Sequence, residues 1–334
     1  MEKLRVGIVG LGWVSQVFHL PILSKMEDVE IVAVCDKDKA RSKMIAERFG
    51  IARHYTDYKQ MLSIEDLGAI DVCTSTDAHL DITMASLEAG KDVFVEKPNA
   101  RRYSEAVLMA DAAKAHKRKL MVGMNNRFRP DTMILKSFLE KNELGKVFFA
   151  KTGWLKKLSN DNPWITQKDK SGGGVFLDLG IVMLDMVLWM MGYPAVQRVS
   201  SKMYKHKTKS VEDSCVAFIE MKNGSTVSLE ASWSFLSEKD FMYCDFYGTE
   251  GSAMINPLRI HKELHGNLVN VTPVKIESPQ NLYKKSYENE LKHFVGAARG
   301  LHEVISTGDE AVLRMRIVEA IYQSAEKGKE INFK

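Results

Sequence analysis

Residues 5–15 read RVGIVGLGWVS, a short apolar strand that runs into closely spaced glycines at the start of a helical pattern. Gly10 allows a tight turn. Gly12 lets a pyrophosphate approach the backbone at a helix N-terminus, where free N–H groups and the helix dipole favour anions. Ser15 replaces the third glycine of such motifs and is small enough for close packing. The stretch predicts a dinucleotide-binding turn, and the alternative is a glycine-rich turn before an ordinary helix. Two further residues of the turn are expected to border the cofactor: Trp13 and Val14.

The first 123 residues alternate strand and helix patterns. Strands are expected at 5–9, 30–35, 69–74, 92–96 and 119–123, with helices at 14–25, 39–49, 77–88 and 104–116. Short apolar strands that alternate with helices indicate a parallel sheet covered on both faces. We therefore expect an α/β fold in which residues 1–124 form a Rossmann dinucleotide-binding domain.

An acidic residue closes the second predicted strand. Asp36 follows Ser15 by 21 residues, where a carboxylate would bind the ribose hydroxyls of the adenosine. Its charge would repel a 2′-phosphate and favours NAD over NADP. Lys37 and Arg41 are close enough in sequence to neutralise such a phosphate, so NADP stays open as the second choice.

Hydroxyl side chains follow the strand expected at 69–74. Thr74, Ser75 and Thr76 offer hydroxyl and N–H groups that would border the cofactor. The alternative is simple capping of the helix that starts near Asp77. His79 lies on the first turn of that helix, as a cofactor neighbour or as a packing residue.

Glu96, Lys97 and Pro98 end the fourth major strand of the first domain. Ligands of α/β sheets bind at the carboxyl ends of the strands, so Lys97 is expected to face the cofactor crevice. It is a candidate proton donor or acceptor. Asp178, in the second half of the chain, is its expected carboxylate partner, unless that side chain only caps the helix that begins there.

The pattern changes after residue 125 and predicts an α+β domain over residues 125–334. Asn223-Gly224 lies between two strand patterns and is a strong hairpin signal. Thr307 and Glu310 have the spacing of a capping box at the start of the last helix. The expected sheet is open and mostly antiparallel. Because its second face needs cover, a homodimer or homotetramer through this sheet is expected.

Composition narrows the class of protein. The 334 residues are 45% hydrophobic and 27% charged, with a formal net charge of +4. The excess charge is small and interleaved, which argues against a nucleic-acid partner. The apolar run 181–192 is shorter than a membrane span, and no secretory signal is expected. The four cysteines show no metal-ligand spacing, so we expect no metal and a reducing, cytoplasmic location.

Several motifs together resemble the Gfo/Idh/MocA oxidoreductases, which include glucose-fructose oxidoreductase and inositol dehydrogenase. The motifs are GLGWVSQVFHLP at 10–21, Asp36, Thr74-Ser-Thr with His79, Glu96-Lys-Pro98, Asn126-Arg-Phe128 and SGGGVFLD at 171–178. The resemblance implies a Rossmann domain followed by an α/β domain, and NAD(P)-linked oxidation or reduction of a sugar, polyol or related carbonyl compound. It also implies that Lys97 is the active-site lysine, that Glu96 helps to hold the cofactor end, and that Asp178 begins a D-x-x-x-H pattern.

The histidine of that pattern is replaced by Val182. Hydride transfer at an alcohol carbon requires a matching proton transfer on oxygen, and Lys97 is the remaining group that can carry it. Burial and a cationic nicotinamide would favour its neutral form, whereas Asp178 would favour the ammonium. We expect Lys97 to transfer the proton and Asp178 to orient substrate hydroxyls or the lysine.

Three more residues are expected at the edge of the site. Asn125 and Arg127 follow the first domain directly, and Trp164 follows Pro163 just before the glycine run. We expect Asn125 beside the cofactor and Arg127 and Trp164 beside the substrate, although Trp164 fits a loop anchor equally well. His19 either borders the same cleft or ends the first helix. Two alternative functions stay open: a cofactor-binding sensor without catalysis, and an NAD-assisted glycosidase.

Overall fold

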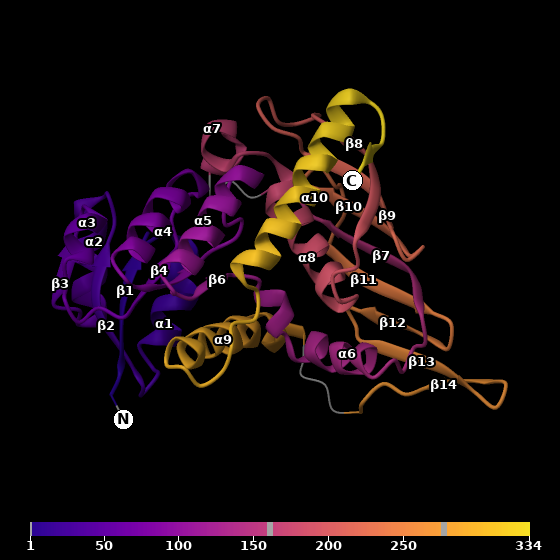
Figure 1. The fold of residues 1–334 in the computed structure, drawn as a ribbon, viewed down its shortest axis with the longest axis horizontal. Helices are drawn as coiled ribbons and strands as arrows, with labels where there is room; N and C mark the ends of the chain where they lie inside the picture. Colours follow the sequence, from indigo (N-terminus) through magenta and orange to yellow (C-terminus); the bar gives the residue numbers. More distant parts are fainter. Residues whose placement is uncertain (1, 159–162, 275–278) are drawn as a thin grey trace. The chain divides into compact units, whose positions relative to one another are not determined.

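A computed structural model of the chain describes residues 2–158, 163–274 and 279–334. It divides into two units (Figure 1). The first contains residues 1–125 and 287–313, and the second contains residues 126–286 and 314–334. The expected division at 124/125 did not anticipate the return of residues 287–313 to the first unit.

The first unit contains a six-stranded sheet in the order β3-β2-β1-β4-β5-β6, and every neighbouring pair is parallel. The strands are β1 Leu4–Val9, β2 Val29–Cys35, β3 Arg53–Tyr55, β4 Ala69–Val72, β5 Asp92–Val95 and β6 Leu120–Val122. Strands β4, β5 and β6 are buried along their whole length, as expected of a parallel sheet covered on both faces. The short β3 was not predicted. The Rossmann fold expected for this half is confirmed.

Helices connect these strands. They are α2 Lys39–Phe49, α3 Tyr58–Leu62, η2 Thr76–Ala78, α4 His79–Glu88, α5 Tyr103–Ala115 and η3 Asn125–Phe128. The residues at the two ends of helix α2 explain where it begins and ends. Asp38 caps its first turn by accepting from the N–H groups of Ala40 and Arg41, and Gly50 ends it at φ +67°, a conformation that favours glycine.

The first helix differs from the expectation of one helix over 14–25. It is a π turn, η1 Ser15–His19, followed by the short helix α1 Leu20–Leu23. A π turn contains one more residue than an α turn and is frequent at functional sites. Hydrophobic periodicity does not reveal it.

The second unit contains a nine-stranded sheet in the order β14-β13-β12-β11-β7-β10-β9-β8-β15. Only the β7–β10 pair is parallel, so the expected open, mostly antiparallel sheet is confirmed. The strands are β7 Val147–Leu155, β8 Val196–Tyr204, β9 Ser214–Met221, β10 Thr226–Ser232, β11 Phe241–Gly248, β12 Gly251–Ile255, β13 Arg259–Leu264, β14 Asn267–Asn270 and β15 Ile331–Asn332. The hairpin at Asn223-Gly224 is confirmed between β9 and β10, with Gly224 at φ +84°.

Helices cover one face of this sheet (Figure 1). Those that pack on the sheet are α6 Pro130–Glu140, η5 Phe176–Gly180 and α8 Ile181–Met190, and the short η4 Pro163–Thr166 and α7 Lys168–Ser171 precede η5 in the chain. Every residue of α8 is buried. The stretch Lys168–Met190 is long and apolar enough to cross a membrane, which the sequence reading did not expect, but 89% of its most apolar window is buried inside the protein. That burial is what the core helix of a folded domain shows.

Two long helices end the chain, α9 Pro279–Ala298 and α10 Gly308–Lys327. Helix α9 starts eight residues before the expected Tyr287. The predicted capping box at the start of α10 is confirmed. The N–H of Thr307 donates to Glu310 Oε2 at 3.0 Å, and the N–H of Glu310 donates to Thr307 Oγ1 at 3.2 Å.

Candidate active site

The glycine turn after β1 has two glycines with different surroundings. Gly10 adopts φ +92°, and a Cβ there would lie 2.6 Å from the carbonyl carbon and oxygen of Cys73. Gly10 is therefore required by the packing of the protein itself. A Cβ on Gly12 would meet no heavy atom within 4 Å, so the turn is open on the side where a pyrophosphate would approach.

Asp36 is bonded to this turn. Its Oδ2 accepts from the N–H of Leu11 at 2.9 Å, and its Oδ1 accepts from the N–H of Asp38 at 2.9 Å. The guanidinium of Arg41 is 3.4 Å from Oδ2, and Lys37 is exposed. The structure thus brings together the acid and both cations on which the preference between NAD and NADP depends.

Trp13 is 51% exposed, and Val14 is half-buried. The indole lies edge-on to Phe18, with ring centroids 5.5 Å apart. Phe18 in turn stacks on Tyr287 of α9 at 4.2 Å. The first turn therefore presents a large exposed aromatic side chain on a stacked base, which fits a residue that borders a ligand.

Thr74, Ser75 and Thr76 follow β4, and only Thr76 is buried. No side chain caps the helical turn η2 that follows, so the capping alternative is wrong. Thr76 Oγ1 is buried without a hydrogen-bond partner. The first two residues expose hydroxyl-bearing side chains beside the Gly10 turn, since Gly10 lies against the backbone of Cys73 and Thr74.

His79 is buried and has a structural role. The residue is 1% exposed, with Nδ1 2.9 Å from the carbonyl oxygen of Pro98 and Nε2 3.1 Å from that of Thr74. Burial lowers the pKa of His79 more than these two carbonyl groups raise it. The neutral ring can donate only one hydrogen bond. His79 therefore ties the Thr74 turn to the Pro98 turn, and the expectation that it touches the cofactor is replaced by this supporting role.

Lys97 is the one residue of 91–100 that is not buried. The N–H of Lys97 donates to Glu96 Oε2 at 3.0 Å, and the Lys97–Pro98 peptide is cis. The carboxyl end of β5 therefore exposes a single ionisable side chain in an otherwise buried segment. This is the position in which an α/β sheet presents groups to its ligand.

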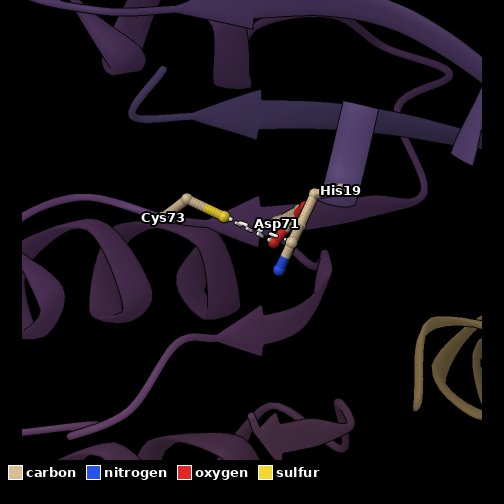
Figure 2. A group of neighbouring side chains, drawn as sticks. All are labelled: His19, Asp71 and Cys73. Atoms are coloured by element: carbon tan, nitrogen blue, oxygen red, sulfur yellow. Dashed lines mark hydrogen bonds and ion pairs between the residues drawn. The ribbon is translucent and has the colours of Figure 1, made fainter. Parts of the chain in front are cut away.

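Glu96 is held by a histidine that the sequence left as a minor candidate. His19, at the end of the π turn, places Nε2 3.1 Å from Glu96 Oε1 and Nδ1 2.8 Å from Asp71 Oδ2. Cys73 Sγ lies 3.3 Å from Nδ1 (Figure 2). Burial opposes the charged ring, but the carboxylate of Asp71 and the contacts around it raise the pKa of His19 well above its ordinary value.

His19, Asp71 and Cys73 are also of the types that ligate metals, and their donor atoms lie within 4.8 Å of one another. The 2.8 Å between Nδ1 and Oδ2 is a hydrogen-bond distance. Two such ligands of one tetrahedral zinc would stand roughly 3.3 Å apart. A shared proton therefore fits this geometry better than a metal ion.

Asp178 is to the second unit what Lys97 is to the first, an ionisable residue that is not buried in an otherwise buried segment. It lies inside the π turn η5, and it is the one residue of 173–190 that is not buried. Its Oδ2 accepts from the indole N–H of Trp233 at 3.1 Å. No side chain caps η5 or α8, so the expectation of a capping aspartate is wrong.

The glycine run before Asp178 is required by close packing. A Cβ on Gly173 would lie 2.1 Å from Tyr322 Oη, and one on Gly174 would lie 1.9 Å from the carbonyl oxygen of Glu212. The Glu212 carboxylate accepts from the N–H groups of Gly174 and Phe176 and from the hydroxyl of Tyr322. Glu212, Tyr322 and Trp233 hold the Asp178 turn. Sequence reasoning missed them because they lie far away in the chain.

The remaining candidates are placed within their own units. Val182 is buried in α8 with 4% exposure, Trp164 is half-buried in η4, and Asn125 is half-buried at the start of η3. The backbone carbonyl of Trp164 accepts a hydrogen bond from the N–H of Gln167. This bond belongs to the backbone turn and does not decide between a loop anchor and a substrate contact for the side chain. The pairing of Lys97 with Asp178 joins the two units and stays a prediction.

Arg127 does not fit the expected contact with substrate. Its side chain is fully buried, and its guanidinium donates two hydrogen bonds to Asp185 at 2.8 and 2.6 Å. Arg314 donates to the same carboxylate at 2.5 Å, and the hydroxyl of Tyr193 also contacts Arg127. Burial alone would raise the pKa of Asp185, but the two guanidinium groups lower it below its ordinary value. Asp185 therefore forms a buried salt bridge with Arg127 and Arg314.

Comparison with known proteins shows the family of the chain. The sequence model of an oxidoreductase family with an NAD-binding Rossmann fold, GFO_IDH_MocA, matches residues 4–124. The model of the C-terminal alpha/beta domain of the same family matches residues 136–333. A D-glucoside 3-dehydrogenase of Escherichia coli K12 is 30% identical over 348 residues, which cover 99% of this chain and 97% of that protein.

Two further relatives support the same assignment. An NAD(+)-dependent scyllo-inositol 2-dehydrogenase of Bacillus subtilis is 24% identical over 337 residues, 98% of this chain and 95% of its own. The solved structure of a levoglucosan dehydrogenase in complex with NADH and L-sorbose superposes with a TM-score of 0.89 over 100% of both chains, at 21% identity. That structure supports the fold.

The Rossmann unit, its glycine turn and the acid that closes β2 define an NAD-dependent oxidoreductase. The chain belongs to the Gfo/Idh/MocA family of oxidoreductases, and it acts on CH–OH groups.

Proposed function

We propose that this enzyme uses NAD to oxidise a secondary alcohol of a sugar, a polyol or a related compound, with Lys97 as the acid–base group. One observation carries the proposal: each unit has a buried segment that exposes a single ionisable side chain, Lys97 in 91–100 and Asp178 in 173–190. The backbone N–H of Lys97 donates to Glu96 Oε2, and the Asp178 carboxylate accepts from the indole N–H of Trp233.

Each group of the site has a separate role in this reaction. NAD supplies the hydride acceptor. The open side of the Gly12 turn and the Asp36 carboxylate would hold its pyrophosphate and ribose. Lys97 takes the hydroxyl proton as the carbonyl forms, and Asp178 accepts hydrogen bonds from neighbouring substrate hydroxyls. Val182 offers no proton acceptor, so the lysine carries a step that an imidazole would otherwise share.

The substrate class rests on the relatives. The E. coli relative that matches along the whole chain is a glucoside dehydrogenase, and another relative is an inositol dehydrogenase. We infer a polyhydroxylated substrate with a ring of similar size. The comparisons favour neither a non-catalytic sensor nor an NAD-assisted glycosidase.

The test is a screen for NADH formation with glycosides, free sugars and inositols, followed by kinetics of Lys97→Met. We expect this variant to lose at least ~10²-fold in kcat, which is typical of a removed acid–base group. Lys114→Met, at an exposed ion pair with Asp309, is the matched control. A Lys97→Met enzyme with more than about a tenth of wild-type turnover would contradict the proposal, because the lysine would then contribute less than acid–base groups typically do.

We also infer that two copies pair through the open face of the large sheet. Strand β9 alternates buried and exposed side chains, and its outward Val216 and Phe218 are 50% and 46% exposed. Phe241 on β11 is 56% exposed. Burial of such side chains drives association. Light scattering should show a dimer or tetramer for the wild type and a smaller species for Val216→Asp with Phe218→Asp, whereas a wild-type monomer would overturn the inference.

A further inference from the structure

Four buried ionisable side chains from four elements of the first unit interact: hydrogen bonds join Asp71, His19 and Glu96, and the charges of these groups act on Glu290. Asp71 comes from β4, His19 from the π turn η1, Glu96 from the end of β5 and Glu290 from α9. Their exposed fractions are 1%, 0%, 9% and 0%. Three carboxyl groups therefore surround one imidazole in a site without access to solvent, which is costly unless the charges are balanced.

We propose that His19 is a positioning residue that keeps the Glu96 carboxylate ionised and bonded to the backbone N–H of Lys97, while Glu290 beside them is a neutral acid. The proposal rests on the role of Lys97 given above. It adds one residue that touches neither cofactor nor substrate and acts through Glu96.

The geometry makes Glu96 a bridge. One carboxylate oxygen faces His19 Nε2 at 3.1 Å, and the other accepts from the N–H of Lys97 at 3.0 Å. His19 is anchored on its far side by Asp71 at 2.8 Å. The path from β4 through the imidazole to the lysine is thus a continuous chain of hydrogen bonds. A carboxylate accepts both of these bonds, whereas a protonated acid would have to donate one.

The charge balance assigns a proton to Glu290. Both of its carboxyl oxygens are buried, and the backbone N–H of Met124 offsets that burial only in part. Burial and the nearby Glu96 raise the pKa of Glu290 well above its ordinary value. For Glu96, burial acts in the same direction, but the bond and the charge of His19 lower its pKa below the ordinary value. The cluster therefore holds two carboxylates, one imidazolium and one neutral acid.

The other groups that face the cluster do not change this balance. Cys73 contacts His19, but burial and Asp71 keep its thiol protonated, because they raise its pKa. Phe94 and Tyr287 lie 5.5 and 6.0 Å from the imidazole ring and add no charge. The positive charge of Lys97 also favours ionised Glu96.

The first test reads the protonation of His19 directly. In ¹⁵N-histidine-labelled full-length protein, the His19 signals are identified as those missing in His19→Gln among the nine histidines. We expect an imidazolium at pH ~7.5, where an ordinary histidine is neutral. A neutral His19 there, or zinc bound in stoichiometric amount to the purified protein, would overturn the proposal. This test requires no substrate, so it is independent of the proposed function.

The second test separates positioning from simple structural support. His19→Gln should lower kcat/KM by ~10- to ~100-fold, a range seen when supporting groups of a site are removed. Because His19 acts through Glu96, adding Glu96→Gln should cost little more. Combining His19→Gln with Asp178→Asn should give the product of the two losses. If the losses in kcat/KM of His19→Gln and Glu96→Gln were fully additive, His19 would not act through Glu96, and the proposal would be refuted.

Glu290 has its own readout. Infrared difference spectra of wild type and Glu290→Gln near neutral pH should contain the carbonyl stretch of a protonated carboxylic acid in the wild type only. Cys73→Ser is the control and should keep that band, since it leaves the charges of the cluster unchanged. Absence of the band in the wild type would show that Glu290 is ionised and would contradict the charge balance.

Discussion

The indole N–H of Trp233, just after β10, donates a hydrogen bond to Oδ2 of Asp178 across 3.1 Å. Trp233 is 1% exposed, so a rigid residue of the sheet holds one oxygen of the carboxylate at the exposed point of the π turn. In the proposed function, the carboxylate held in this way orients substrate hydroxyls. Such preorganisation is what supporting residues contribute to a site.

This contact predicts different effects for its two partners. Trp233→Phe removes the donor but keeps most of the packing, and we expect a rise in KM with a small loss in kcat. Asp178→Asn should lower kcat/KM by ~10²-fold or more if it orients the reacting alcohol. Steady-state kinetics with the substrate found by screening measures both. A larger loss of kcat/KM in Trp233→Phe than in Asp178→Asn would contradict this prediction.

The glycine turn gives a matched pair of variants. Gly10→Ala places a Cβ at φ +92° and 2.6 Å from the backbone of Cys73, so thermal stability should fall by more than the ~1–2 kcal/mol of the backbone strain alone. Gly12→Ala meets open space and should keep its melting temperature while binding NAD more weakly. Calorimetric melting and NAD titration distinguish the two. Equal melting temperatures for both variants would be inconsistent with the packing at Gly10.

The buried ion network of the second unit predicts a large effect on stability. Asp185→Asn leaves Arg127 and Arg314 buried without their shared carboxylate, and breaking such a pair costs about 3–5 kcal/mol. Glu330→Gln, at an exposed pair with Arg198, should cost no more than ~1 kcal/mol. Urea unfolding measures both. Comparable losses in the free energy of unfolding of the two variants would show that the buried network contributes little to stability.

His79 predicts a dependence of stability on pH. Its pKa is lowered in the fold, so its contribution is full above the unfolded value of ~6.5 and decreases as the pH falls below it. Each pH unit between the two pKa values removes up to ~1.4 kcal/mol. The stability difference between wild type and His79→Gln should therefore shrink from pH ~7.5 to ~5. A difference that stays constant over this range would mean that His79 keeps its ordinary pKa.

Local signals were sufficient for the fold. The Asn223-Gly224 hairpin and the Thr307–Glu310 capping box depend on neighbours within a few residues, whereas Gly10 and Asp36 were recognised from their places after the first and second strands. The structure has each of these features. Strand β3 was missed because it is only three residues long and has no clear apolar pattern.

The supporting residues of the site could not be predicted in this way. Trp233 and Glu212 reach the Asp178 turn from 55 and 38 residues away. Arg127 was read as a ligand residue because it follows the first domain, but its partner Asp185 lies 58 residues further along the chain. Burial and pairing at such separations follow from the packing of the sheet, which periodicity does not encode.

Two residues of the site lie in π turns, His19 in Ser15–His19 and Asp178 in Phe176–Gly180. Because a π turn contains one residue more than an α turn, removal of one residue there would restore regular winding and rotate the residues before the turn by about 100° relative to those after it. Evolution can thus reorient His19 or Asp178 through a single-codon insertion or deletion, without a substitution. Sequence alignments of relatives should place one-residue gaps at these two turns, and such gaps would mark where the geometry of the site has changed.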